Sequence, residues 1–161
     1  MKTLWAPWRM EYIEGKAGGK GCFFCAAPDL VYSAEDLILY RDRLLVVLMN
    51  RFPYANGHLL VAPARHLADL CELSGEENTA LAAMLQRCVG ILRRHLQPDG
   101  FNIGLNLGEV AGAGLASHLH WHIVPRWAGD HNFLTVLAEV RTIPEHLNST
   151  FARLRPEFQP R

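Results

Sequence analysis

The sequence predicts an α+β domain: a mostly antiparallel five-stranded sheet with one long helix and one or two short helices. Five short segments rich in apolar residues are joined mainly by short connections, which is typical of antiparallel strands. A single long segment repeats apolar residues at helical spacing. At 161 residues, the chain is long enough for a single domain with one core, and we expect residues 1–161 to form it.

The first three strands are expected at residues 37–40, 44–48 and 58–62. The charged residues 41–43 between the first two indicate a hairpin. Residues 50–57 then form a loop, in which Asn56 and Gly57 are the turn signal. His58 and His66 stand at the two ends of the third strand, where each, taken singly, is expected to be a structural hydrogen-bonding residue.

The long helix begins after Ser74, because Ser74 and Glu77 have the spacing of a capping box. It ends near Leu96, ahead of Pro98, and a short helix is expected at residues 144–154. Residues 155–161 are predicted to be a polar tail. The apolar positions that repeat along the long helix are Leu81, Met84, Leu85, Cys88, Ile91 and Leu92.

The fourth strand is expected at residues 101–107, and the glycine-bearing residues 108–114 connect it to the fifth. This connection has two interpretations that the residues alone leave open. It is either a plain hairpin connection or a loop whose glycines let backbone N–H groups approach an anion.

The fifth strand, residues 116–127, is the most informative segment, because His118, His120 and His122 alternate with apolar residues until Pro125 ends the run. Alternation with a period of two places all three imidazoles on one side of a strand. Neighbouring histidines then stand ~6.6 Å apart at the backbone and the outer two ~13 Å apart. Zinc requires each nitrogen at ~2.0–2.1 Å, so three histidines on one straight strand cannot share an ion. Their functions must differ.

The charges exclude a general affinity for polyanions, since 16 basic and 16 acidic side chains give a formal net charge of zero. We therefore expect neither a nucleic-acid partner nor a membrane surface. No apolar run approaches the ~20 residues of a membrane span, and the first residues do not resemble a signal peptide, so a cytoplasmic location is expected. Residues 1–20 are interpreted as an N-terminal arm and loop, whose aromatic residues dock on the domain itself or across a dimer.

Two of the four cysteines, Cys22 and Cys25, form a C-x-x-C motif, which in a reducing compartment is a metal-binding or a redox motif. The surrounding glycines and proline do not suit the strand–helix setting of a redox motif, so a metal is favoured, and two further ligands are required. Histidine is the natural donor. Cys71 and Cys88 are interpreted as buried, small apolar side chains.

The run H-L-H-W-H-I-V-P-R resembles the signature of the histidine triad (HIT) superfamily, whose members transfer or hydrolyse nucleotides at an α-phosphate. The resemblance extends to N-R-F-P-Y-A-N-G-H-L-L-V-A-P-A-R-H and F-N-I-G-L-N-L-G-E-V-A-G-A-G, and it covers most of residues 22–134. The segments L-W-A-P-W-R-M and V-P-R-W-A-G-D-H-N-F resemble the branch that acts on diadenosine tetraphosphate. A HIT-like fold is therefore expected.

The resemblance implies a function for each histidine. His120 corresponds to the nucleophile that forms a nucleotidyl-histidine intermediate, and His122 to the histidine that contacts the phosphate or its bridging oxygen. In zinc-bearing relatives, two cysteines join two histidines, which here implies one structural Zn²⁺ per chain. Its ligands would be Cys22, Cys25, His66 and His118.

The substrate-binding residues implied by the resemblance are Asn50 at the ribose, Asn106 near the phosphate, and Gly112 and Gly114 in the phosphate loop. The two asparagines have an alternative interpretation as turn-stabilising side chains. Leu45, Val47 and Leu59 are candidates for an apolar base pocket, although core packing is favoured.

The chain departs from many relatives at Leu115, where they have a Ser or Thr that donates to the phosphate; a leucine is usual in the tetraphosphate branch. Ser117 is expected to point to the opposite face. Backbone N–H groups or another residue would then replace the missing donor.

The expected function is cleavage of a dinucleoside polyphosphate such as diadenosine tetraphosphate at an α-phosphate, by phosphorolysis or hydrolysis. The expected partners are a purine nucleotide such as AMP or a dinucleoside polyphosphate and, from the resemblance, a second copy of the chain in a homodimer. The alternative is a zinc-stabilised purine-nucleotide-binding module with little turnover.

Overall fold

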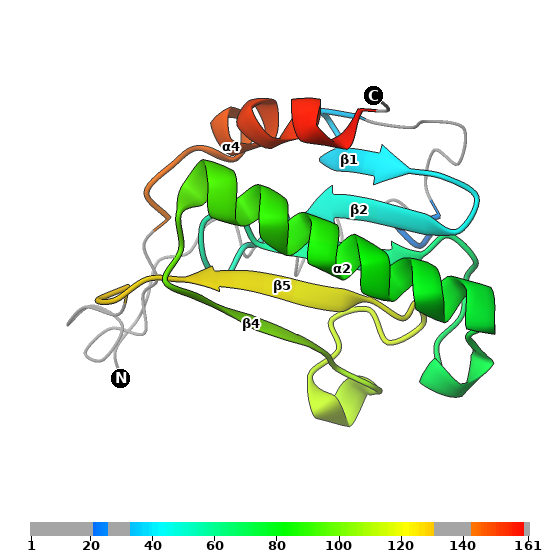
Figure 1. The fold of residues 1–161 in the computed structure, drawn as a ribbon. Coiled ribbons are helices and arrows are strands. Elements are labelled where there is room, and N and C mark those ends of the chain that lie inside the picture. Colours follow the sequence, from blue (N-terminus) through cyan, green and yellow to red (C-terminus); the bar gives the residue numbers. More distant parts are fainter. Residues whose placement is uncertain (1–20, 26–32, 131–142, 160–161) are drawn as a thin grey trace, which may run out of the picture.

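The fold is a single antiparallel sheet with helices on one of its faces (Figure 1). The computed structural model describes residues 21–25, 33–130 and 143–159. Five strands lie in the order β1-β2-β3-β5-β4, and every neighbouring pair is antiparallel. The predicted five-stranded antiparallel sheet and the α+β class are thus confirmed.

The strands follow the predicted segments closely. They are β1 (Ile38–Arg41), β2 (Leu45–Met49), β3 (Leu59–Pro63), β4 (Gly100–Leu105) and β5 (Trp121–Arg126). The described helices are α2 (Gly75–Leu96) and α4 (Leu147–Leu154), with short 3₁₀ turns η1 (Leu70–Glu72), η2 (Glu109–Ala111) and η3 (Arg155–Phe158).

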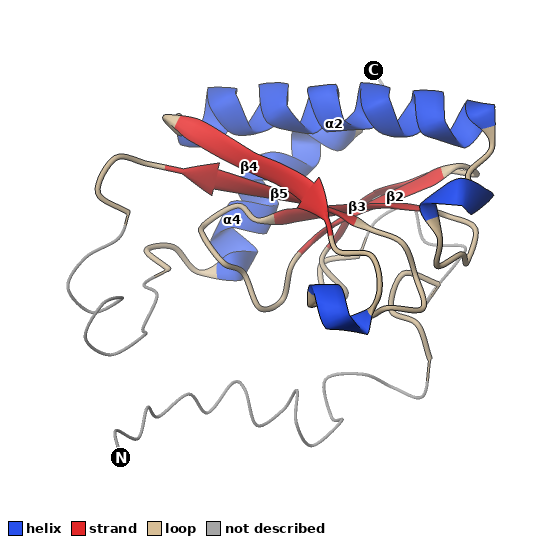
Figure 2. Ribbon diagram, turned by 90° about the horizontal axis from the view of Figure 1, so that it is seen from below, coloured by secondary structure: helices blue, strands red, loops and turns tan. Residues whose placement is uncertain are grey.

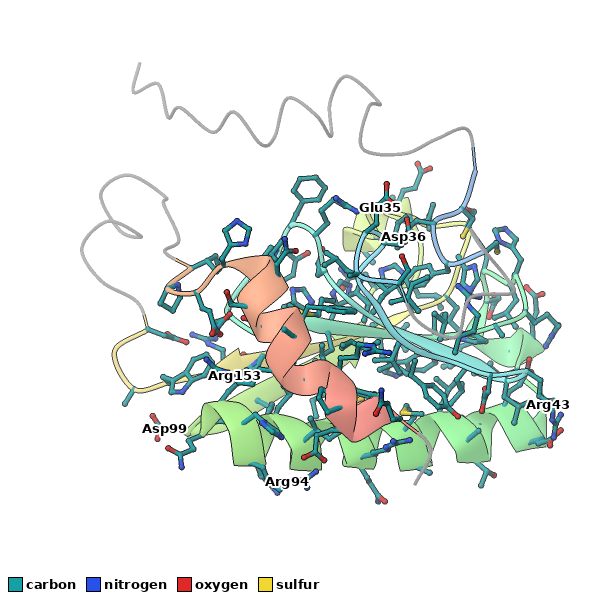
Figure 3. All side chains as sticks on the ribbon, turned by 90° about the horizontal axis from the view of Figure 1, so that it is seen from above. Glu35, Asp36, Arg43, Arg94, Asp99 and Arg153 are labelled. Atoms are coloured by element: carbon teal, nitrogen blue, oxygen red, sulfur yellow. The ribbon has the colours of Figure 1, made fainter. Side chains whose placement is uncertain are left out.

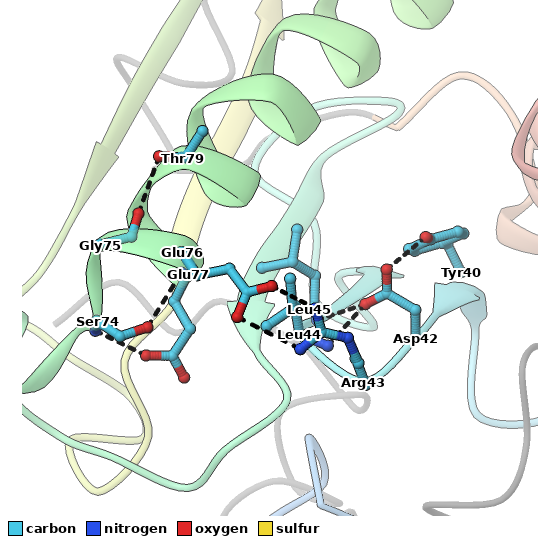
Figure 4. Close-up of polar contacts among 10 residues, drawn as sticks. All are labelled: Tyr40, Asp42, Arg43, Leu44, Leu45, Ser74, Gly75, Glu76, Glu77 and Thr79. Atoms are coloured by element: carbon cyan, nitrogen blue, oxygen red, sulfur yellow. Dashed lines mark hydrogen bonds and ion pairs between the residues drawn. The ribbon is translucent and has the colours of Figure 1, made fainter.

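Helix α2 begins with the predicted capping box (Figure 4). The hydroxyl of Ser74 accepts from the backbone N–H of Glu77 at 3.2 Å, and the Glu77 carboxylate accepts from the backbone N–H of Ser74 at 2.8 Å. Arg43, in the β1–β2 turn, forms an ion pair with Glu76 in the first turn of α2. These contacts fix the beginning of the helix against the hairpin.

The sheet is buried on both faces at its centre, and the two faces have separate apolar clusters. Alternate residues of β2 divide between them: Val47 lies on the side covered by α2 and α4, and Val46 on the opposite side. Figure 2 shows α2 along one face and the loop with η2 beyond the other. The second cluster comprises Phe24, Ile38, Val46, Leu48, Leu60 and Ala62.

The prediction for the fifth strand was wrong at its beginning, because β5 starts at Trp121 rather than near residue 116. Its pairing with β3 extends only from Val61 opposite Trp121 to Leu59 opposite Ile123. Pro125 does not end the strand either. It pairs with Phe101 of β4, and it lies beyond Ile123, the last residue of β5 that has a partner in β3. A proline is tolerated there because one side of the strand lacks a ladder partner.

Three further predictions were wrong. The segment interpreted as a polar tail contains η3, and Phe158 within it is 2% exposed in the cluster under α2. The short helix preceding it begins at Leu147 and not near residue 144. Cys71 is exposed in η1, whereas Cys88 is buried as expected.

Charged side chains lie at the periphery, as Figure 3 shows for Arg43 and for Arg94 on α2, whose side chains are 72% and 57% exposed. Among the described residues, no helix combines the length and the apolar character that crossing a membrane requires. The aromatic residues of the N-terminal arm lie outside the described residues.

Candidate active site and metal centre

The three histidines gather on the face of the sheet opposite α2. Trp121 and Ile123 pack in the cluster under α2, so the intervening His122 points to the other side. The ring centroid of His120 lies 4.9 Å from that of His122 and 5.2 Å from that of Phe24. The alternation predicted from the sequence therefore persists ahead of β5, although no ladder forms there.

This face is not solvated at His118 and His120, which are 1% and 6% exposed. Phe24 covers them, and its backbone is fixed in two ways. The guanidinium Nη2 of Arg41 donates to the Phe24 carbonyl at 2.8 Å, and the N–H of Cys25 donates to the Cys22 carbonyl at 3.0 Å. The C-x-x-C turn is thus the cover of the histidine face.

The four residues predicted as metal ligands converge. The side-chain ligand atoms of Cys22, Cys25, His66 and His118 all lie within 4.8 Å of one another. Nδ1 of His118 lies 3.1 Å from the Cys22 sulfur and 3.5 Å from the Cys25 sulfur, which itself lies 3.3 Å from Nδ1 of His66. Ligand atoms around a tetrahedral zinc lie roughly 3.3–3.8 Å apart, so small adjustments would accommodate the ion.

The outer contact of His118 also suits a metal. Its Nε2 lies 2.9 Å from the Pro63 carbonyl, which can only accept, so Nε2 carries the hydrogen and Nδ1 presents its lone pair to the cluster. Burial, followed by the neighbouring Cys22 sulfur, raises the pKa of the Cys25 thiol, and a cation would reverse this by stabilising the thiolates. Two sulfurs and two imidazoles are a donor set typical of structural zinc.

His120 has the tautomer that a nucleophile requires. Its Nδ1 donates to the carbonyl of His118 at 2.8 Å, so Nε2 has a free lone pair. Burial lowers the pKa of His120, opposed by this hydrogen bond, which favours the charged ring. A neutral, oriented imidazole is nucleophilic, and the carbonyl stabilises the positive charge that develops on attack.

His122 is held by a fourth histidine. Nε2 of the fully buried His58 lies 2.9 Å from Nδ1 of His122. Nδ1 of His58 accepts from the backbone N–H of Tyr54 at 3.1 Å and lies 3.3 Å from the side-chain nitrogen of Asn50. The hydrogen of His58 is therefore on Nε2, which donates to His122. His122 must then carry its own hydrogen on Nε2.

Burial determines the charge of His122. Burial, with a smaller contribution from His120, lowers the pKa of His122 to about 4. The ring is thus neutral at neutral pH before a phosphate arrives, and it offers an Nε2–H donor instead of a cation.

The ring of Tyr54 is an unexpected component of the site. Its centroid lies 5.8 Å from that of His122, with an angle of 12° between the ring planes, and 4.6 Å from that of His58. Tyr54 nevertheless remains 46% exposed. The sequence places Tyr54 in a turn-rich loop, and nothing in its local spacing indicates this contact.

Comparison with known proteins identifies the family of the chain. A family model described as the HIT domain matches residues 32–129. The chain belongs to the HIT domain family. The AP-4-A phosphorylase of Mycobacterium tuberculosis is 36% identical over 165 residues, covering 98% of this chain and 85% of that protein. The bis(5'-adenosyl)-triphosphatase of Dictyostelium discoideum is 30% identical, covering 82% of this chain and 91% of that protein.

Solved HIT structures are similar along most of the chain. A zinc-bound histidine triad family protein from Mycobacterium smegmatis superposes with a TM-score of 0.66 at 30% identity, covering 86% of this chain and 93% of that chain. The resemblance on which the HIT-like fold was predicted is thereby confirmed.

The HIT-type substrate residues have internal partners. Asn50 accepts from the backbone N–H of Phe52 at 2.9 Å, and the side-chain nitrogen of Asn106 donates to the Gly112 carbonyl at 3.2 Å. The N–H of Gly112 donates to the Glu109 carbonyl at 2.9 Å. Gly114 follows in the exposed turn that leads to His118. Both asparagines thus stabilise turns, as the alternative interpretation proposed.

The candidates for a base pocket lie elsewhere. Leu45, Val47 and Leu59 are at most 2% exposed in the cluster under α2, on the face away from the histidines, so they are core residues. Leu115 packs against the apolar cluster around Phe24. Ser117 is exposed in the turn before His118.

Proposed function

We propose that this chain cleaves dinucleoside polyphosphates such as diadenosine tetraphosphate at an α-phosphate, through a nucleotidyl-histidine intermediate on His120. The observation that carries the proposal is the buried, neutral His120, whose Nδ1–H donates to the His118 carbonyl beside a second oriented imidazole. The AP-4-A phosphorylase and the bis(5'-adenosyl)-triphosphatase among its relatives support the substrate class.

In the first step, the lone pair on Nε2 of His120 forms a bond to the α-phosphorus, and the bond from that phosphorus to the bridging oxygen breaks. The leaving oxygen accepts a hydrogen bond from the Nε2–H of His122, which the His58 contact directs outward, and the polyphosphate departs as an anion. The Nδ1–H to the His118 carbonyl stabilises the cationic nucleotidyl-imidazole.

In the second step, phosphate or water attacks the same phosphorus, the N–P bond breaks, and His120 returns to its neutral form. The proton that the attacking water or phosphate hydroxyl gives up passes to solvent, and His122 keeps its Nε2 hydrogen throughout. Phosphate as the acceptor gives ADP and ATP from diadenosine tetraphosphate, and water gives AMP and ATP. Neither acceptor is favoured by a described contact.

In this proposal Asn50 contacts the ribose and Asn106 lies near the phosphate. Each side chain is held in its turn by a hydrogen bond to the backbone. The loop with Gly112 and Gly114 faces the phosphate. Since the Gly112 N–H already donates to Glu109, other N–H groups of this loop are the better candidates to replace the donor absent at Leu115.

We also propose one structural Zn²⁺ held by Cys22, Cys25, His66 and His118. When bound, the ion would crosslink the C-x-x-C turn to the loop after β3 and to the histidine segment. Thiolate ligands are retained in a reducing compartment, which agrees with a cytoplasmic location.

Residues 1–161 act as one domain, and we propose that two copies form a homodimer. Strand β4 lies at an edge of the sheet, and Ile103 within it is 48% exposed. Leu107, just after the strand, is 45% exposed. An unpaired edge with exposed apolar side chains is suited to pairing with a second copy.

The test is incubation with diadenosine tetraphosphate, with and without phosphate, followed by product separation. We expect ATP with either ADP or AMP, and loss of all turnover in His120→Ala with unchanged thermal unfolding. Turnover that survives this substitution would exclude His120 as the nucleophile. Nucleotide binding without turnover by the wild type would indicate the alternative function, a zinc-stabilised nucleotide-binding module.

A further inference from the structure

The turn that ends at His58 is held at its second residue by the C-terminal region. The N–H of His58 donates to the Ala55 carbonyl at 3.2 Å, and φ of Gly57 is +72°, which matches the third residue of a type II turn. Asn56 is the second residue of this turn and is 8% exposed. The position of His58 at the end of the turn therefore depends on how Asn56 is fixed.

The side chain of Asn56 is bound by two residues that lie 89 and 94 positions further along the chain. Its Nδ2 donates to the Glu145 carboxylate at 3.3 Å, and its Oδ1 lies 3.0 Å from the hydroxyl of Thr150. That hydroxyl also lies 2.7 Å from the Glu145 carboxylate, so its one hydrogen is shared between the two acceptors. Thr150 belongs to α4 and is fully buried. Both polar atoms of the Asn56 amide thus have partners from the C-terminal region.

The Glu145 carboxylate accepts every contact made to it in this cluster. Thr150 and Asn56 bond to it, and Arg153 forms an ion pair with it. These donors lower the pKa of Glu145, with the Thr150 hydroxyl as the largest cause, so the carboxylate is ionised at neutral pH. A hydrogen bond to an ionised acceptor is stronger than one between neutral groups. The contact between Asn56 and Glu145 is therefore of the stronger kind.

His58 passes this constraint to the candidate active site. Its Nε2 lies 2.9 Å from Nδ1 of His122, and its carbonyl accepts from the N–H of Asn50 at 2.9 Å. A displacement of His58 would lengthen the hydrogen bond that sets the tautomer of His122, and it would shift Asn50 as well. Small displacements are costly in catalysis, since a misplacement of about 1 Å can reduce a rate about 100-fold.

We propose that Asn56 is a positioning residue, through which Glu145 and Thr150 hold His58 against His122. The inference rests on the proposed function for the part that His122 plays in the reaction. The hydrogen bond between the two imidazoles is nevertheless present without substrate. The proposal requires that the polar contacts of Asn56, and not the apolar packing of α4, maintain this hydrogen bond.

The experiment exchanges the amide and the carboxylate. Asn56→Asp places a second carboxylate against Glu145, whereas the double variant Asn56→Asp with Glu145→Gln restores one amide and one carboxylate in exchanged positions. Leu154→Ala is the matched control for the stability of α4, because Leu154 is fully buried in the cluster under α2. The readouts are kcat/KM for diadenosine tetraphosphate, thermal unfolding, and the Nε2–H signal of His58 in heteronuclear NMR spectra of the substrate-free protein.

We expect Asn56→Asp to lose the His58 signal through exchange with water and to lower kcat/KM about tenfold or more. The double variant should recover the signal and return kcat/KM to within about threefold of wild type. Leu154→Ala should unfold at a lower temperature but keep the signal and, within about twofold, kcat/KM.

The proposal would be overturned if Asn56→Asp kept the His58 signal, or if Leu154→Ala lost it as fully as Asn56→Asp does. Thr150→Val removes one of the two partners of Asn56 at nearly constant shape. It gives the same test if Asn56→Asp does not fold, and it should weaken the His58 signal more than Leu154→Ala does.

The NMR readout needs no turnover, so the two proposals can fail separately. If wild-type protein does not cleave diadenosine tetraphosphate but the His58 signal depends on Asn56 as expected, the proposed chemistry is wrong and the positioning by Asn56 stands. If cleavage depends on His120 and the His58 signal survives in Asn56→Asp, the chemistry stands and Asn56 only attaches α4 to the turn.

Discussion

Nε2 of His58 lies 2.9 Å from Nδ1 of His122, although the two residues are 64 positions apart in the sequence. Because the Tyr54 N–H donates to the other nitrogen of His58, the direction of this hydrogen bond is determined. His122 receives it and must present its own hydrogen to the substrate. A backbone amide thus sets the tautomer of His122 through an intermediate ring.

Replacing His58 should affect hydrogen-bond donation to the leaving group more than substrate binding. In His58→Phe, His122 is free to adopt either tautomer, so we expect kcat for diadenosine tetraphosphate to fall about tenfold or more, with little change in KM. The measurement is steady-state kinetics. The internal control is adenosine 5′-(p-nitrophenyl phosphate), whose delocalised phenolate depends little on a hydrogen bond from His122 and whose kcat should change less than about threefold. Equal losses on both substrates would contradict this function of His58.

Removing a cysteine ligand should remove the metal and lower stability together. We expect purified protein to contain about one zinc per chain, and Cys22→Ala to lose the zinc and unfold at a lower temperature, since structural zinc contributes directly to folding. Cys71→Ala is the matched control, because Cys71 is exposed and lies outside the cluster. A wild type that is free of metal and equally stable in the presence of a chelator would refute the zinc site.

The capping carboxylate of α2 predicts a specific dependence of stability on pH. The Arg65 guanidinium and the backbone N–H of Ser74 lower the pKa of Glu77 to about 2, from an ordinary value of 4.5. A depressed folded-state pKa stabilises the protein above the unfolded value and loses this effect as the pH falls. Glu77→Gln should therefore be less stable than wild type above pH 4.5, with the difference vanishing toward pH 2. Denaturant unfolding across this range is the measurement.

Glu76→Gln is the matched control for that measurement. The Glu76 side chain is 59% exposed and pairs with a 72% exposed Arg43. Exposed pairs contribute ~0–1 kcal/mol, so this variant should remain close to wild type at every pH. A pH dependence in Glu76→Gln as large as that in Glu77→Gln would show that the buried carboxylate is not its source.

Gly57 should tolerate no side chain. Its φ is +72°, and an added Cβ would lie 2.3 Å from Cδ1 of Leu96 and 3.3 Å from Leu92. Gly57→Ala combines backbone strain with overpacking, so we expect it to destabilise the protein by about 1–3 kcal/mol in denaturant unfolding. Gly90→Ala, inside α2 with ordinary contacts only, should be neutral or stabilising by up to ~1 kcal/mol. If Gly57→Ala had the same free energy of unfolding as wild type, the loop would have to move away from α2 without loss of stability.

Local patterns predicted most of the fold because their physical causes are local. The capping box at Ser74 and the alternation around His120 depend on neighbouring residues, and both occur in the structure. Phe158 was assigned to a polar tail because its burial depends on α2 and β1, which are distant in the sequence. The late beginning of β5 at Trp121 likewise depends on pairing with β3 and β4, which the alternation of residues 116–120 does not encode.

The candidate site was likewise predictable only in part from the sequence. Spacing identified Cys22 and Cys25 as a pair of ligands, and the resemblance to the HIT superfamily added His66 and His118. The structure brings the four side chains together. Neither spacing nor the resemblance predicted the hydrogen bond between His58 and His122, since the ring nitrogens of a histidine can pair with many kinds of group. The neutral state of His122 follows from burial, which requires the packed structure.

His118 contributes to the site in two directions, with its imidazole in the metal cluster and its carbonyl at Nδ1 of His120. A carbonyl is present whatever the residue type, but its placement depends on how the imidazole is anchored. The Nε2 contact with Pro63 is an anchor that involves no metal. A chain without both cysteines would therefore keep His120 oriented, provided that residue 118 remained a histidine, so the orientation of His120 is separable from the proposed metal site.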